Sequence, residues 1–302
     1  MKIKTFNDLA VAAKAMPRKT VIAVVQAQDE HTLDALVKAK REGLVDALLI
    51  GDAEKIGALL GRLGGLDLNF TVVPAATQED ALALAVAAIH DGRAGALMKG
   101  KIDSADFLKA VVSRDNGIRG EGKLSVIGFY ETAAYHKLFA VTDFAMNTTP
   151  DVDGKRAILG NAVALLCKLG VANPKVAVLS ESEKLNPKIP ASADAAALKQ
   201  LWQDGEITDC VVEGPISFDL ATSAEAAEIK GYTSPVAGDA DLLLVPDIVS
   251  GNILVKSLTG IAGAQTAGTL LGARIPVIMT SRSAEAADKF YSIALAAVAA
   301  AK

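Results

Sequence analysis

The chain has 302 residues, enough for about two domains. It is 51% hydrophobic but only 4% aromatic, so its cores must be built from Ala, Val, Leu and Ile. Together with 22% charged residues, this composition excludes a disordered or collagen-like chain. Lys and Arg number 31 against 35 Asp and Glu, a net charge of −4, which argues against a protein that binds nucleic acid.

The first part of the chain alternates short apolar runs with amphipathic stretches. Continuous apolar strands separated by helices are typical of βαβ units and a parallel sheet covered on both faces. In chain order we predict a strand at 20–26, a helix at 30–41, a strand at 45–50, a helix at 52–63, a strand at 70–73, a helix at 78–90 and a strand at 94–98.

The pattern changes after residue 98 and resumes near residue 155. Between these points we expect a short helix at 105–113, two antiparallel strands at 124–130 and 137–142, and a domain hinge at 142–153. The later elements are helices at 155–168, 193–203, 221–229, 253–258 and 284–300, and strands at 175–180, 209–212, 241–245, 266–271 and 276–279. The chain therefore reads as two α/β domains with mainly parallel sheets.

Neither a membrane span nor a signal peptide is indicated. The longest apolar run, 293–301, is shorter than the roughly 18 residues that a span needs. The first eight residues contain no continuous apolar core of the kind that signal peptides have. We therefore expect a cytoplasmic protein without a membrane partner.

The cysteines and histidines predict no metal site. Cys167 and Cys210 lie far apart, without a CxxC pair or a nearby His, so we expect both to be core residues. His31 and His90 are expected on helix surfaces. His136 is a weaker functional candidate, because it precedes a strand that enters a polar loop.

The usual nucleotide-binding motifs are not present. No GxGxxG follows a predicted strand. The run 117–123 has the GxxxxGK spacing of a P-loop, but Leu124 stands where a Ser or Thr should bind magnesium, and no strand precedes the run. We therefore expect neither a dinucleotide site nor a P-loop.

Two segments of the first domain carry polar residues beyond what a scaffold needs. Lys99 and Gly100, with Ser104 shortly after them, follow a buried strand directly, and ligands of parallel sheets bind beyond the carboxyl ends of strands. A solvated turn is the competing interpretation for this segment. Arg119 lies in a glycine-rich loop whose backbone amides could approach an anion.

Two further segments combine a strand end with a helix start. Ser250, Gly251 and Asn252 are followed one turn later by Lys256, which predicts a phosphate site at a helix N-terminus. Arg282 lies at the mouth of the last helix, where a cation alone is unfavourable. Its position is explained if an anion lies between the arginine and the helix amides.

These segments together resemble the phosphate acetyl/butyryl transferase family. The likeness extends from about residue 19 to the C-terminus, and the segment NPKIP at 186–190 resembles the butyryltransferase branch in particular. The runs that carry it are KG at 99–100, VEGP at 212–215, SPVAGDAD at 234–241, LLVPDIVSGN at 243–252 with Lys256, and TSR at 280–282.

The resemblance implies a fold like that of isocitrate and isopropylmalate dehydrogenases. Residues 1–143 and 281–302 would form the first α/β domain, and residues 144–280 the second, which would provide the interface of a homodimer. The active site is then expected in the cleft between the domains. The implied reaction converts acyl-CoA and inorganic phosphate reversibly into acyl phosphate and CoA, with CoA as a substrate and no tightly bound cofactor.

The resemblance also assigns roles at the last helix. Ser281 would donate a hydrogen bond to the acyl oxygen, and Arg282 would neutralise phosphate or thiolate. Asp288 matches the spacing of the family's acid–base carboxylate, with Glu285 as the competitor. The chain departs from the family at Ser104 and its neighbour Asp103, where relatives often have His or Thr, and at Phe144, which is bulkier than expected in its loop.

The leading hypothesis is therefore a phosphate butyryltransferase that works through a direct ternary complex. The close alternative is a phosphate acetyltransferase with the same mechanism. Two alternatives from other classes are a metal- and NAD(P)-dependent hydroxyacid dehydrogenase on the same fold and a non-catalytic protein that binds CoA or acyl phosphate. No convincing metal or nucleotide motif favours the dehydrogenase, and the intact Ser281, Arg282 and Asn252 argue against the binding protein.

Overall fold

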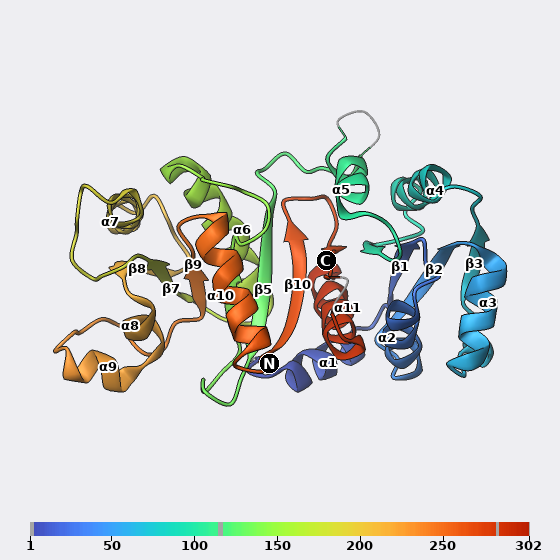
Figure 1. Ribbon diagram of the computed structural model, residues 1–302, viewed down its shortest axis with the longest axis horizontal. Helices are drawn as coiled ribbons and strands as arrows, with labels where there is room; N and C mark the ends of the chain where they lie inside the picture. Colours follow the sequence, from blue (N-terminus) through green and yellow to red (C-terminus); the bar gives the residue numbers. More distant parts are fainter. Residues whose placement is uncertain (1–2, 114–116, 282–283, 302) are drawn as a thin grey trace. The chain divides into compact units, whose positions relative to one another are not determined.

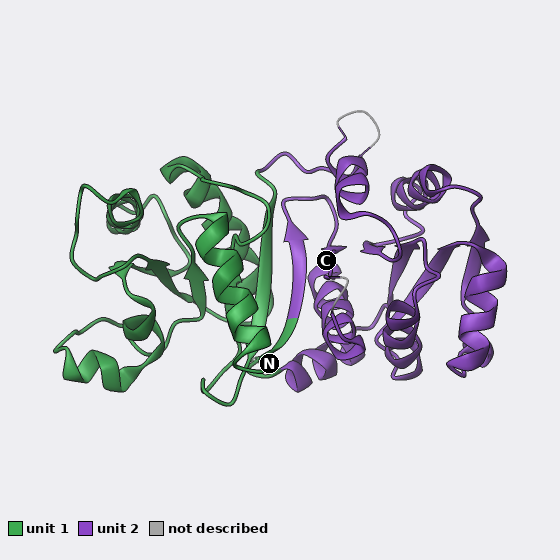
Figure 2. Ribbon diagram, viewed as in Figure 1, with its two compact units in different colours: residues 1–5, 123–266 green, residues 6–122, 267–302 purple. Residues whose placement is uncertain are grey.

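Residues 3–113, 117–281 and 284–301 are described by a computed structural model. The chain divides into two units (Figure 2): unit 1 comprises Met1–Thr5 and Lys123–Thr266, and unit 2 comprises Phe6–Gly122 and Ala267–Lys302. Each unit is built from mainly parallel strands with helices packed on the sheet faces (Figure 1). The α/β class that the sequence predicts is confirmed.

The units differ from the expected boundaries at 143/144 and 280/281. Strands β5 (Ser125–Glu131) and β6 (Phe139–Thr142) were expected in the first domain but belong to unit 1. They pair with each other, and β6 also pairs with β9 (Leu242–Leu244) of the same unit. Strand β10 (Gln265–Leu271) pairs with β11 (Val277–Ile278) of unit 2. The hinge expected at 142–153 lies inside unit 1, and helix α6 (Val152–Lys168) begins within it.

Unit 2 carries strands in the order β3-β2-β1-β4-β11-β10, of which all neighbours are parallel except β11 and β10. Helix α1 was not predicted, and it packs against α11. The remaining elements of the unit are β1 (Thr20–Val25), β2 (Val45–Gly51), β3 (Thr71–Pro74), β4 (Ala96–Lys99), α1 (Phe6–Ala15), α2 (Glu30–Arg41), α3 (Ala53–Arg62), the 3-10 helix η1 (Leu66–Leu68), α4 (Gln78–His90), α5 (Ser104–Val112) and α11 (Ala286–Ala300).

Four helices that follow strands of unit 2 begin with side-chain caps. Asp29, Asp52, Thr77 and Asp103 each accept a hydrogen bond from a backbone amide in the first turn of α2, α3, α4 and α5. Such caps satisfy amides that have no partner inside the helix. They explain why these helices begin where the apolar strands end.

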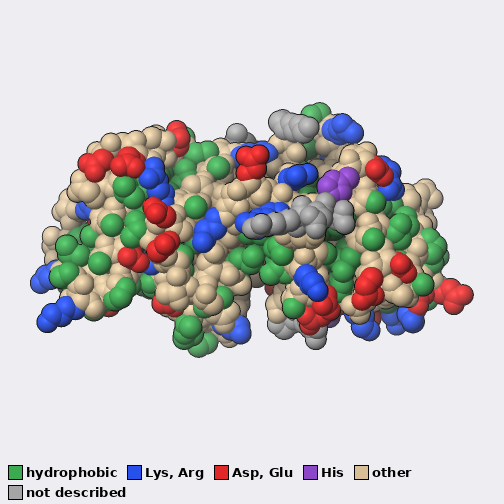
Figure 3. Space-filling view, turned by 90° about the horizontal axis from the view of Figure 1, so that it is seen from above, with side chains coloured by type: hydrophobic (Ala, Val, Ile, Leu, Met, Phe, Trp, Pro, Cys, Tyr) green, Lys and Arg blue, Asp and Glu red, His purple; other side chains and the backbone are tan. Residues whose placement is uncertain are grey.

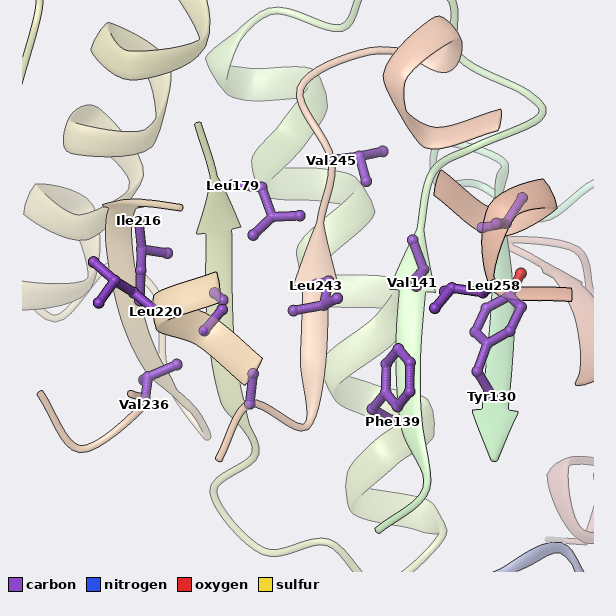
Figure 4. Packing of buried hydrophobic residues seen from close by; sticks show 14 of the residues in the cluster. Tyr130, Phe139, Val141, Leu179, Ile216, Leu220, Val236, Leu243, Val245 and Leu258 are labelled. Atoms are coloured by element: carbon purple, nitrogen blue, oxygen red, sulfur yellow. The ribbon is translucent and has the colours of Figure 1, made fainter. Parts of the chain in front are cut away.

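Unit 1 carries strands in the order β5-β6-β9-β7-β8. β5 and β6 are antiparallel, as predicted, and the others are parallel. Aliphatic side chains from these strands and the neighbouring helices pack together with Tyr130 and Phe139 (Figure 4). The remaining elements are β7 (Lys175–Leu179), β8 (Val211–Ile216), β9 (Leu242–Leu244), α7 (Pro190–Gln203), α8 (Phe218–Thr222), α9 (Ala224–Ile229) and α10 (Ile248–Gly260).

The cysteines differ from each other in exposure. Cys210 is buried, as expected, but Cys167 is exposed, so the expectation of a core residue is wrong there. Cys167 lies on α6 beside the buried Leu165, Leu166 and Leu169, and the helix turns its side chain away from the core. His31 and His90 are exposed on α2 and α4, as predicted.

Within the described ranges, no helix combines the length and the apolar character that crossing a bilayer requires. The face drawn in Figure 3 carries side chains of both charge signs.

The segment SPVAGDAD ends in two carboxylates that connect the starts of three strands in unit 1. Asp239 accepts hydrogen bonds from Lys175 Nζ at 2.6 Å and His136 Nε2 at 2.9 Å, and pairs with Lys137 Nζ at 2.8 Å. Asp241 accepts from Lys137 Nζ at 2.6 Å and from the backbone amide of Lys175 at 2.8 Å. This run of the sequence therefore has a structural role, and His136 belongs to it.

Replacing Asp239 tests this network. Burial alone would raise the pKa of Asp239, but the hydrogen bonds from Lys137, Lys175 and His136 outweigh it and lower the pKa below the ordinary value of 3.8. Stability from this carboxylate is therefore present above about pH 4 and is lost as the pH falls towards the folded-state pKa. We expect Asp239→Asn to lower the free energy of unfolding by about 1–2 kcal/mol at pH 7, because the site is partly exposed.

Urea unfolding at pH 7 and pH 3 measures this effect, and the difference between wild type and variant should shrink at pH 3. Asp67→Asn is the control, because Asp67 is exposed and its ion pair with Arg41 spans 3.7 Å. An equal loss in both variants would contradict the assigned role.

Candidate active site

The KG and TSR segments of unit 2 leave two adjacent parallel strands at the same sheet edge. In the register of β4 and β11, Met98 lies opposite Ile278. Lys99 ends the first strand and Gly100 follows it, while Thr280 and Ser281 come shortly after the second strand. Because parallel strands end at one edge, the structure brings these two predicted site segments together.

Lys99 is almost completely buried, with 5% of its surface exposed, at the end of β4. The backbone amide of Gly100 donates to Val25 O at 2.9 Å, and a Cβ at Gly100 would collide with the carbonyl oxygens of Val25 and Gln26. The glycine is therefore required by the approach of β1. Ser104 is exposed at the start of α5, one residue after its cap.

A hollow of about 650 Å³ lies beside this edge. Its lining is polar, with both amides and charged groups. It comes from the ends of the strands and from the neighbouring helices α2, α3 and α4. The lining residues are Gln26, Gln28, Asp29, Glu30, Lys55, Ala58, Leu59, Arg62, Gln78 and Lys101.

Arg119 lies in the segment that follows α5 and is exposed. It forms an isolated antiparallel bridge with Ala273, and the amide of Arg274 donates to Ile118 O at 2.9 Å. The backbone at Ile118 and Arg119 is thus hydrogen-bonded to the turn between β10 and β11. The run 117–123 follows a helix and precedes strand β5, which is the reverse of the strand–loop–helix order of a P-loop.

Ser281, Asp288 and the competing Glu285 lie just before and at the start of the last helix, α11. Ser281 is exposed before the helix, Glu285 is exposed at the N-cap position, and Asp288 is half-buried in the first turn. The side chain of Glu285 makes no capping hydrogen bond. Arg282 lies outside the described residues.

Helix α10 of unit 1 begins earlier than the expected residue 253. Its N-cap is Asp247, whose carboxylate accepts hydrogen bonds from the amides of Val249 and Ser250 at 2.9 Å. The next amide, that of Gly251, donates to Asp247 O at 3.1 Å. The amides that we expected to bind phosphate here therefore already have acceptors inside the protein.

Gly251 is required by packing rather than by a ligand. A Cβ at this position would lie 2.7 Å from Val245 Cγ2 and 2.9 Å from Phe144 Cβ. Phe144, the bulky departure from the family pattern, thus packs against α10. Asn252 is partly exposed and Lys256 is exposed, so both side chains can meet a ligand.

A mainly apolar cavity of about 400 Å³ adjoins the start of α10 in unit 1. Ser250 contributes a hydroxyl to it. The other lining residues are Leu179, Ser180, Glu181, Ile189, Ala191, Phe218, Val245, Pro246 and Leu254.

The sequence reasoning missed Lys289 of α11. Its side chain is 5% exposed, and its Nζ donates to Thr280 Oγ1 at 3.0 Å. A signal was available, because residue 289 falls on the same helix face as the buried Ile293 and Ala296. A lysine on the apolar face of a helix is unusual, because burying its charge is costly, and its presence there indicates a specific role.

The VEGP motif is also structural. Glu213 accepts from Lys199 Nζ at 2.6 Å, from Ser234 Oγ at 2.8 Å and from the amide of Gly214 at 3.1 Å. Since Ser234 begins SPVAGDAD, two of the segments that carry the family resemblance are joined here.

The chain is similar to proteins named as phosphate acyltransferases. It is 39% identical to the phosphate butyryltransferase of Clostridium acetobutylicum, over 99% of each chain. It is 41% identical to a phosphate acetyltransferase of Rhizobium meliloti, over 74% of this chain and 70% of the relative.

Solved structures agree with this relationship. A branched-chain phosphotransacylase from Enterococcus faecalis is 32% identical and superposes with a TM-score of 0.82, covering 93% of this chain and 99% of the other. A structure from Salmonella typhimurium named for 4-hydroxythreonine-4-phosphate dehydrogenase has a TM-score of 0.57 at 13% identity, covering 94% of this chain and all of the other. The latter shows the predicted dehydrogenase-like fold alone.

The family model for "Phosphate acetyl/butaryl transferase" matches residues 58–297, which is most of the chain. This match agrees with the resemblance that the sequence motifs indicated. The chain belongs to the phosphate acetyl/butyryl transferase family, and it is a phosphate acyltransferase.

Proposed function

We propose that this phosphate acyltransferase favours a butyryl group and transfers it directly between CoA and inorganic phosphate in a ternary complex. The observation that carries the assignment of residues is the parallel pairing of β4 with β11. It supports a reacting centre at the sheet edge where the segments of Lys99–Gly100 and Thr280–Ser281 leave neighbouring strands. The close alternative is acetyl transfer by the same mechanism.

In the proposed reaction, CoA thiolate attacks the carbonyl carbon of the acyl phosphate. A C–S bond forms, the C–O bond to phosphate breaks, and inorganic phosphate leaves with the bonding electrons. Asp288 takes the proton of the thiol, and Ser281 donates a hydrogen bond to the carbonyl oxygen as it gains charge. Arg282 neutralises the phosphate or the thiolate. The reverse reaction uses the same groups.

The start of α11 supports an anion at this place. The N-terminus of a helix carries partial positive charge, and Glu285 does not satisfy it through a side-chain bond. The start of α10 is different, since Asp247 occupies it. We therefore propose that Asn252 and Lys256 bind substrate through their side chains.

The remaining residues proposed to contact substrate have cationic or small side chains. Lys99 and Arg119 supply charge for phosphate groups, and Ser104 and Ser250 supply hydroxyls. Gly100 and Gly251 contribute indirectly, by permitting the close packing of the strand end and the helix that carry their neighbours.

Neither cysteine suits covalent catalysis. Burial raises the pKa of the Cys210 thiol to about 12, and partial burial together with the nearby Asp209 raises the pKa of Cys167. Since the thiolate is the nucleophilic form, both groups are poor nucleophiles at neutral pH. This favours a direct ternary mechanism over an acyl-enzyme on sulfur.

The butyryl preference rests on the relatives and on the NPKIP segment. The full-length match to a phosphate butyryltransferase supports it, while the match to an acetyltransferase at a similar identity keeps the alternative open. We also propose a cytoplasmic homodimer. Exposed apolar side chains on unit 1 support the dimer, since Val249 is 64%, Ile253 62% and Ile261 88% exposed.

Thiol release from butyryl-CoA tests the proposed function. We expect release that requires phosphate, and a higher kcat/KM for butyryl-CoA than for acetyl-CoA. Initial-rate plots at varied acyl-CoA and phosphate should intersect, because both substrates are bound before chemistry. Parallel plots, with an acylated peptide recovered by mass spectrometry, would indicate ping-pong kinetics and a covalent intermediate instead. A preference for acetyl-CoA would select the alternative.

The pH dependence of variants distinguishes Asp288 from Glu285 as the catalytic base. If Asp288 is the base, Asp288→Asn should lower kcat for the reaction of CoA with butyryl phosphate most near pH 7. The loss should shrink towards pH 9, because the unperturbed CoA thiol ionises unaided near a pKa of about 8.5. Glu285→Gln is the matched control and should change kcat little. The reverse ranking would assign the base to Glu285.

The dimer is tested by an acidic substitution on α10. Ile253→Asp should shift the protein from dimer to monomer in sedimentation or light scattering, because a charge would be buried in the interface. Leu66→Asp is the control, since Leu66 is 65% exposed in unit 2. A monomeric wild type, or an unchanged dimer in Ile253→Asp, would contradict this interface.

A further inference from the structure

Lys289 is a buried cation that the proposed reaction has not used. It lies in the first turn of α11 with 5% of its surface exposed. A positive charge is unfavourable at the start of a helix, and a buried ammonium group is costly unless it is paired. Across residues 3–113, 117–281 and 284–301, its only hydrogen bond is to the neutral Thr280 Oγ1, at 3.0 Å, and it forms no ion pair.

Lys155 shows how this protein accommodates a buried lysine that serves structure. It is 3% exposed on α6, and its Nζ lies 2.6 Å from Asp194 Oδ2. Its charge is thus compensated directly. Lys289 has no such compensation among the described residues, although Asp29 and Asp288 act on it electrostatically from further away.

Burial lowers the pKa of Lys289, and the opposing effect of Asp29 and Asp288 does not restore it. The side chain therefore has an electrostatic cost in the folded protein. An apolar residue of similar size at this position would avoid that cost. A reason other than stability is needed to explain the lysine.

The position of Thr280 supplies the reason. Thr280 follows β11 and directly precedes Ser281, so the bond from Lys289 ties the first turn of α11 to the segment that carries the reacting serine. The Thr280 oxygen accepts this bond from a cation. Such bonds are stronger than neutral ones, and they fix the side chain and its backbone more firmly.

We propose that Lys289 is a positioning residue for acyl transfer, acting through Thr280 to hold Ser281 where the reacting carbonyl oxygen must lie. This inference rests on the proposed function, because it assigns the purpose of the bond to the role of Ser281. Lys289 itself does not touch the reacting atoms. It fixes the position of the neighbouring segment that carries Thr280 and Ser281.

The test compares kinetics with stability in the full-length protein. Lys289→Met and Thr280→Val keep the side-chain size and remove the bond. Each should lower kcat about 10- to 100-fold, the scale expected from a misplaced reacting group, with KM for butyryl-CoA and phosphate changed less than about twofold. The melting temperature of Lys289→Met should be equal to or higher than that of wild type.

Two controls separate positioning from a merely structural role. Thr280→Ser keeps the hydroxyl and should lose much less activity than Thr280→Val. Lys155→Met breaks a paired buried lysine in unit 1 and should lower the melting temperature, while kcat per folded molecule stays unchanged. If Lys289→Met also lowers the melting temperature and loses activity only in proportion to its unfolded fraction, the proposal is wrong.

A double-mutant cycle completes the experiment. If Lys289 acts through Thr280, Lys289→Met combined with Thr280→Val should be no slower than the worse single variant. Additive losses would show two independent effects and overturn the proposal. A wild type that releases no thiol with phosphate would defeat the proposed function, and this inference with it. An active wild type with fully active Lys289→Met would defeat this inference alone.

Discussion

The parallel pairing of β4 with β11 is the constraint on which the arrangement of the candidate site in unit 2 depends. β11 is only Val277–Ile278, yet its register with Leu97 and Met98 sets where both chains leave the sheet. Lys99 and Thr280 come from segments far apart in sequence and lie at the same sheet edge because these two strands are neighbours. A one-residue slip would turn every following side chain to the opposite face. Site geometry here is a consequence of strand register.

Much of the fold could be predicted because its elements are locally encoded. The alternation of apolar strands with amphipathic helices correctly indicated the α/β class with mainly parallel strands, and the two strands near residues 125–142 were correctly expected to be antiparallel. The predicted first residues of the helices were less accurate. We expected α10 from residue 253, whereas Asp247 caps it and begins it at Ile248. The unit boundaries also differ from expectation. The hairpin of β5 and β6 belongs to unit 1 because β6 pairs with β9, about 100 residues further along the chain, and such a long-range pairing has no local signal in the sequence.

The sequence segments that reveal the family are not all parts of the candidate site. SPVAGDAD and VEGP contribute Asp239, Asp241 and Glu213 to networks of lysines and backbone amides in unit 1. Distinctive motifs therefore identified the family through its scaffold as much as through its chemistry. Gly251 illustrates the same point, since its missing side chain makes room for Phe144. Residue type alone cannot distinguish a glycine that admits a ligand from one that admits a neighbouring side chain.

The two helix starts of the candidate site show why local chemistry must be taken from the structure. Both α10 and α11 follow strand ends and have polar residues in or near their first turns. The sequence pattern therefore predicts an anion site at the start of each helix. At α10, the carboxylate of Asp247 already occupies the amides, which leaves Asn252 and Lys256 to meet substrate through side chains. At α11, Glu285 makes no side-chain cap, and a buried lysine stands in the first turn without an ion pair among the described residues. Since stability favours neither feature, the chemistry of the acyltransferase is the better explanation for α11, whereas α10 is already satisfied by its own fold.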